Sequence, residues 1–108
     1  MSVVMVIEFA AVVAEIHEQS RVSGRQQWLI GLDRTEFREG DSGTFEAVSR
    51  SGARLVVPVL SVEVDEAGET WHLVEKPLMV GTEITGRVGP RVGGDRHWLI
   101  HLELVFGA

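Results

Sequence analysis

Apolar and polar residues alternate at every second position along several short segments of this chain, and turn residues separate these segments. The clearest is 96–106, where every even position from 98 onward is tryptophan, isoleucine, leucine or phenylalanine. In 26–33 the same period places Trp28, Ile30 and Leu32 on one face. A period of two is that of a β-strand with one buried and one solvated face. The chain is therefore constrained to β-structure.

Five further segments complete the pattern, and they are 3–18, 44–48, 54–65, 69–75 and 80–88. Pro58 cannot donate a ladder hydrogen bond, so it predicts a sheet edge or a bulge. Glu66–Gly68 reads as a tight hairpin loop with glycine at its left-handed position. About seven mostly antiparallel strands predict an all-β fold, closed as a small barrel or a sandwich.

The phase of each segment predicts which side chains face the core. In 54–65 and 69–75, the residues predicted to face inward are Val56, Leu60, Val62, Val64, Trp71 and Leu73. In 80–88, Ile84 and Val88 share a face opposite the charged residues.

Residues 8–19 fit two structures. A strand needs a bulge near Val12–Ala14, because the apolar face changes sides there. A helix would align Phe9, Val12 and Ile16 in one stripe. Because residues 3–7 favour β-structure, we predict a long bent strand and keep the helix as the alternative.

One motif occurs twice, once near each end of the chain. Residues 21–33 and 91–103 are identical at seven of thirteen positions without a gap, including both tryptophans. A strand precedes each copy, which indicates a repeated strand–loop–strand unit. We predict a single domain of residues 1–108, duplicated from two halves that meet near 49–53. The alternative is that short β-sequences have converged.

The composition excludes several classes of function. The chain has no cysteine, so it has no disulfide and no thiolate metal site. Its net charge of −6 argues against binding to nucleic acid backbone, which needs a basic surface. The apolar N-terminus lacks a basic region, is interrupted by Glu8 and is too short to span a bilayer. We predict a cytoplasmic protein without membrane contact.

The outward face suggests a surface for a protein partner or a second copy. Leu29 and Leu99 occupy equivalent positions in the repeat where a polar residue is expected, and Val57 and Val59 add to this apolar second face. Acidic residues, including the hairpin tip 65–69, would form a rim that suits a basic partner. A small acidic module of this kind fits an inhibitor or immunity-type protein of a basic enzyme.

The repeat loops support a second hypothesis. Each loop carries two arginines, Arg21 and Arg25 in the first and Arg91 and Arg96 in the second. Paired arginines bind phosphate and carboxylate groups well. The protein would then be a barrel that binds a small anionic ligand. The alternative is that these arginines are exposed loop residues paired with neighbouring acids.

The third hypothesis is a metal-dependent enzyme. The second repeat copy presents His97, His101 and Glu103 on one strand face. The two histidines are about 13 Å apart along a strand, too far to share one metal. His101 and Glu103 could share one with His72 from a neighbouring strand. No nucleophile motif accompanies the serines, so we favour a non-enzymatic protein, name no catalytic residue and expect no cofactor.

Overall fold

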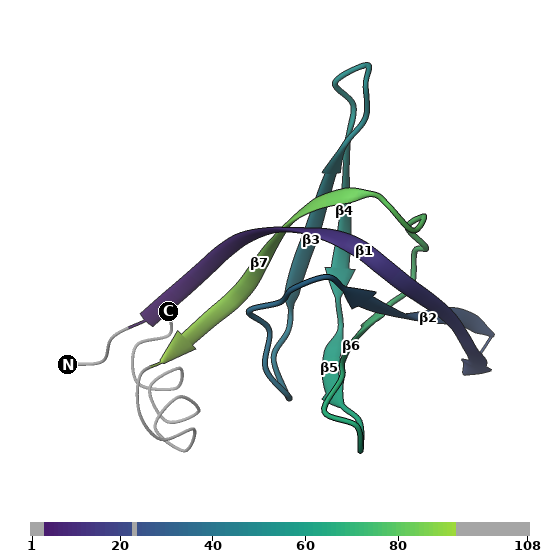
Figure 1. Cartoon of the computed structure of the whole chain (residues 1–108), viewed down its shortest axis with the longest axis vertical. Coiled ribbons are helices and arrows are strands. Elements are labelled where there is room, and N and C mark those ends of the chain that lie inside the picture. Colours follow the sequence, from purple (N-terminus) through teal and green to yellow (C-terminus); the bar gives the residue numbers. More distant parts are fainter. Residues whose placement is uncertain (1–3, 23, 93–108) are drawn as a thin grey trace.

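The computed structural model describes residues 4–22 and 24–92, which form one curled sheet of seven antiparallel strands (Figure 1). In chain order the strands are β1 (Val4–Val22), β2 (Arg25–Leu32), β3 (Gly43–Val48), β4 (Arg54–Val59), β5 (Ser61–Val64), β6 (Thr70–Val74) and β7 (Glu83–Val92). Within these ranges there is no helix, and so none long and apolar enough to cross a membrane. The all-β prediction is confirmed.

The strand order β4-β3-β7-β1-β2-β6-β5 places β1 at the centre of the sheet. The first half of β1 pairs with β7, and its second half pairs with β2. Figure 1 shows β1 arching across the molecule between these two partners. The two halves of the sheet curl toward each other, so the fold is a half-barrel with β4 and β5 at its edges.

The bend of β1 lies where the sequence predicts it. The register with β2 shifts between Val13 and Glu15, which leaves Ala14 as the extra residue of a bulge. The bulge keeps Val13 in the core, with 1% of its surface exposed, and returns Ile16 to the same side. The strand interpretation of residues 8–19 is therefore confirmed, and the helix is excluded.

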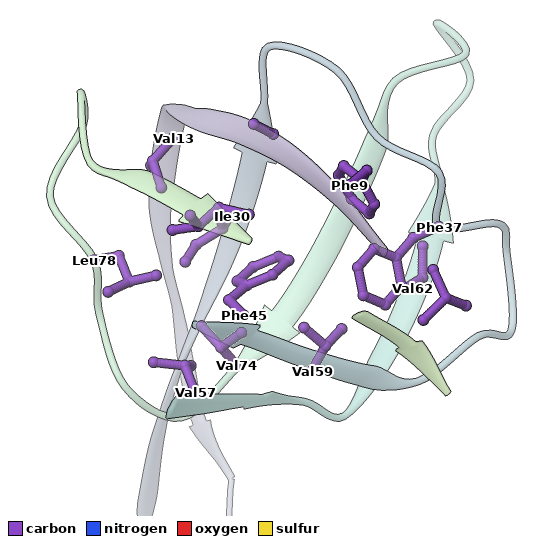
Figure 2. Close-up of a cluster of buried hydrophobic side chains, with 13 residues drawn as sticks. Phe9, Val13, Ile30, Phe37, Phe45, Val57, Val59, Val62, Val74 and Leu78 are labelled. Atoms are coloured by element: carbon purple, nitrogen blue, oxygen red, sulfur yellow. The ribbon is translucent and has the colours of Figure 1, made fainter. Parts of the chain in front are cut away.

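The core fills the concave side of the sheet (Figure 2). Its centre is a group of aromatic rings in edge-to-face contact. Phe37 lies 5.8 Å from Phe9 and 5.7 Å from Phe45 between ring centroids. Phe9 and Phe45 come from β1 and β3, whereas Phe37 comes from the loop after β2. This loop residue joins the two halves of the core, and alternation alone does not predict it.

The segment 54–65 is two strands rather than one. β4 ends at Val59 and β5 begins at Ser61, so the phase changes at Leu60. Val57 and Val59 are 1% and 2% exposed and lie in the core, whereas Val56 is 45% exposed.

The outward placement of Val57 and Val59 is therefore wrong, as is the inward placement of Val56. Leu60 and Val64, also predicted to face inward, are exposed as well, whereas Val62 is buried as predicted. Residues 55–60 are all apolar or proline, so their sequence does not define a phase. Only the break between the two strands at Leu60 decides which of these residues face the core. The prediction of a sheet edge at Pro58 is confirmed, because β4 is an edge strand.

β6 also faces the opposite way from the prediction. His72 and Val74 are fully buried, and Trp71 and Leu73 are half-buried on the outer face. Apolar residues occupy both phases of this strand, and the larger ones lie outside because His72 finds polar partners in the core. In β7 the inward phase is as predicted, with Ile84 and Val88 buried.

Most of the second repeat copy lies outside the described residues. The strand predicted for 96–106 falls there, together with Leu99, Arg96, His97, His101 and Glu103. The internal duplication stays a prediction.

Gly86 tests the packing of β1 against β7. A Cβ atom at Gly86 would lie 2.6 Å from the Cζ of Phe9, although the backbone there is ordinary strand. We expect Gly86→Ala to lower the free energy of unfolding by about 1–3 kcal/mol, measured by urea denaturation. In a Phe9→Leu background the same alanine should cost clearly less, because the ring atoms that it meets are gone. An equal cost in both backgrounds would contradict this packing.

Candidate functional site

Three apolar side chains lie together on the outer face of the sheet. Leu29 of β2 pairs with Leu73 of β6, and Trp71 lies two residues before Leu73 on the same face. All three are half-buried. We call these three residues the leucine–tryptophan patch. The neighbouring outward positions on β1 and β5 are polar, namely His17 beside Leu29 and Ser61 beside Leu73.

The ring of Trp71 is held in place from three sides. It lies over Gly31, where a Cβ atom would be 3.2 Å from the ring. The edge of His17 contacts it, with 5.1 Å between ring centroids. Its indole N–H donates to Oδ2 of Asp65 at 3.0 Å. A glycine within a strand often marks such a close approach, and Gly31 was the available signal for this contact.

Asp65 places a negative charge beside the patch. Besides the indole N–H, its carboxylate accepts the backbone N–H groups of Ala67 and Glu69, each at 2.9 Å. The hydrogen bond from Trp71, followed by those from the backbone, lowers the pKa of Asp65. The carboxylate therefore stays ionised at neutral pH.

Other carboxylates surround the patch. Glu63 pairs with Trp71 across β5 and β6, and Glu15 pairs with Gly31 across β1 and β2. Glu75 follows β6 in the phase of Leu73, with 3.7 Å between its carboxylate and Arg25. We call Glu15, Glu63, Asp65 and Glu75 the acidic rim.

The structure places the residues predicted for the interface in different parts of the fold. Leu29 faces outward as predicted, beside Leu73 in the patch. Val57 and Val59 belong to the core and cannot contribute to a surface. Trp71 and Leu73 take their place, although the sequence analysis assigned both to the core. Leu99 lies outside the described residues.

Arg25 and Arg91, one arginine from each predicted pair, do not come together. Arg25 pairs with Val22 at the end of β1, and Arg91 pairs with Met5 near its start. The full length of the central strand separates these positions. One small anion therefore cannot contact both. The guanidinium of Arg25 instead lies near Glu75.

His72 is a core residue with both ring nitrogens occupied. Nδ1–H donates to the carbonyl oxygen of Ile30 at 2.7 Å, because a carbonyl can only accept. Nε2 consequently accepts the hydroxyl hydrogen of Thr35 at 2.9 Å, and this hydroxyl accepts the N–H of Phe37 at 3.0 Å. Neither nitrogen has a lone pair left for a metal. No group of three metal-binding side chains occurs within 4–22 and 24–92.

Two hollows lie among the described residues. One, of about 400 Å³, is lined by Ile16, Glu18, Trp28, Pro77, Leu78 and Met79. It has one carboxylate and lacks the convergent polar groups that orient a small ligand. The other, of about 470 Å³, lies outside β1 and β7 around Asp33, Glu46 and Glu83. Asp33 and Glu46 already bind a backbone N–H and two arginines, respectively.

Comparison with protein-family models, with curated proteins and with solved structures finds no match. The assignment of a site therefore rests on geometry and chemistry alone. The leucine–tryptophan patch is the one of these surfaces that combines an ordered aromatic side chain with a ring of charge.

His72 makes stability depend on pH. Burial lowers its pKa below 6.5, so the unfolded chain takes up the proton first. The contribution of neutral His72 is fully present above about pH 6.5 and is lost as the pH falls through the lower folded-state pKa. We expect urea denaturation to show a smaller free energy of unfolding at pH 5 than at pH 7.5.

The matched control is His72→Gln, whose amide does not titrate. This variant should start less stable at pH 7.5 but lose less between the two pH values. If both proteins lose the same amount, other groups cause the pH dependence.

Proposed function

We propose that this protein is a non-enzymatic module that binds a protein partner through the leucine–tryptophan patch and its acidic rim. The observation that carries the proposal is the outward position of Leu29, Trp71 and Leu73 on two adjacent strands. Outer positions of an open antiparallel sheet are usually polar. An ordered apolar group there favours contact with another molecule.

The leucine–tryptophan patch and its acidic rim resemble a binding hot spot. A tryptophan at the centre of a polar ring is typical of the residues that dominate binding energy. Gly31, His17 and Asp65 already fix the ring of Trp71. Less conformational entropy is therefore lost when a partner covers it.

The charge of the rim indicates the chemistry of the partner. Four carboxylates surround three apolar side chains, and the whole chain has a net charge of −6. The negative electrostatic potential of these carboxylates speeds the approach of a basic surface and repels an acidic one. A partner with lysine or arginine around a few apolar side chains fits best. An inhibitor or immunity-type protein that covers a basic enzyme would use this kind of surface.

A displayed random-peptide library selected against the purified protein tests this proposal. We expect selected peptides to combine arginine or lysine with leucine or aromatic residues. Their affinity, measured by isothermal titration calorimetry, should fall about tenfold or more for Leu73→Thr, because an apolar hot-spot contact contributes over 1 kcal/mol. Threonine keeps the strand propensity at this position.

Two exposed glutamates give a matched pair of charge variants. Glu63→Lys changes the rim, and Glu83→Lys makes the same change on the outer face of the other half of the sheet, on β7. Binding should weaken for Glu63→Lys and not for Glu83→Lys. Selected peptides that are acidic, or that bind both variants and Leu73→Thr equally well, would refute the proposal.

A further inference from the structure

The β3–β4 hairpin is a second unusual surface, at the other end of the molecule. It stands out from the rest of the sheet (Figure 1). Three of its apolar side chains are widely exposed, with Val48 at 60%, Leu55 at 41% and Val56 at 45%. Exposed apolar residues on an edge strand invite contact with another chain.

The two edges of the sheet are protected unequally. β5 has four residues and carries Glu63, and a short charged strand is a poor template for pairing. β4 has six residues and carries Arg54 and Pro58, but its Leu55 and Val56 are exposed. The β4 edge is therefore the one that remains open to contact.

The hairpin also differs from the rest of the chain in charge. The hairpin, residues 43–59, contains Arg50, Arg54 and one carboxylate, Glu46. Its net charge is +1 in a chain of net charge −6, so the remaining residues carry −7. The side chain of Arg54 is 73% exposed, and its contact with Glu46 is long, at 3.9 Å. The hairpin is thus basic and apolar, whereas the leucine–tryptophan patch is apolar with an acidic rim.

These two surfaces complement each other, and this leads to a specific partner. We propose that the β3–β4 hairpin of one copy docks on the leucine–tryptophan patch of a second copy. Val48 and Val56, which share the outer face of the hairpin with Arg54, would cover the patch, and Arg50 and Arg54 would lie against its rim. Leu55 lies on the opposite face of the hairpin and takes no part in this contact. The inference rests on the proposed function and names the partner of that same site. β5 and β6 lie toward the end of the molecule opposite the hairpin tip, so the contact joins two copies (Figure 1).

The contact joins different surfaces on the two copies. Such a head-to-tail arrangement gives a ring if the rotation closes and a growing chain if it does not. We therefore expect the average mass in sedimentation equilibrium to rise with concentration and to fall with added salt.

Charge exchange between the two surfaces tests the inference. Arg54→Glu alone and Glu63→Lys alone should each weaken association about fivefold, because each places like charges together. Mixing the two variants should restore it, since the changed hairpin then meets the changed rim. The double variant in one chain should also associate. Arg38→Glu and Glu83→Lys make the same charge changes elsewhere and should leave association unchanged.

Each other outcome overturns the inference in a distinct way. If Arg54→Glu weakens association and Glu63→Lys does not, the copies meet through their β4 edges. If the wild type stays monomeric and selected basic peptides still bind in a Leu73-dependent way, the second copy is not the partner and the proposed function stands. If neither association nor peptide binding depends on Leu73, both proposals fail.

Discussion

The structure depends on the pairing of one long strand with two partners. β1 bonds to β7 along its first half and to β2 along its second, so it belongs to both halves of the sheet. The bulge at Ala14 lets it turn from one half to the other without taking Val13 out of the core. Without this bend, the strand would present its apolar face to the core over only part of its length.

The inside of the half-barrel is closed by contacts that the strands alone do not provide. Phe37 comes from a loop and joins the rings of Phe9 and Phe45. His72 contacts two of these rings and bonds to the backbone of β2 and to Thr35. A buried polar ring is tolerated because each of its nitrogens has a partner. The inward position of His72 sends its neighbours Trp71 and Leu73 outward, and so creates the surface patch.

The candidate site therefore results from the hydrogen bonds that hold His72 in the core. On the outer face of the sheet, the ring of Trp71 needs a surface without a side chain to pack on and an acceptor for its indole N–H. Gly31 provides this surface, and Asp65 provides the acceptor. The outward position of Leu29 follows from the sequence, because Leu29 lies in the polar phase of its alternating strand. The outward positions of Trp71 and Leu73 do not, because a large apolar residue in a strand is more often buried.

The sequence by itself determined the β-structure of this chain and its excess of acidic residues, and it indicated a bulge in the first strand and a sheet edge or a bulge at Pro58. These follow from local rules: the period of two, the missing N–H of proline and the count of charges. The tertiary structure decided which face of β4 and of β6 is buried. In both strands apolar residues occupy the two phases, so alternation has no preferred side. The break at Leu60 decides which face of β4 is buried, and the hydrogen bonds of His72 decide it for β6. Both depend on contacts between residues far apart in the chain.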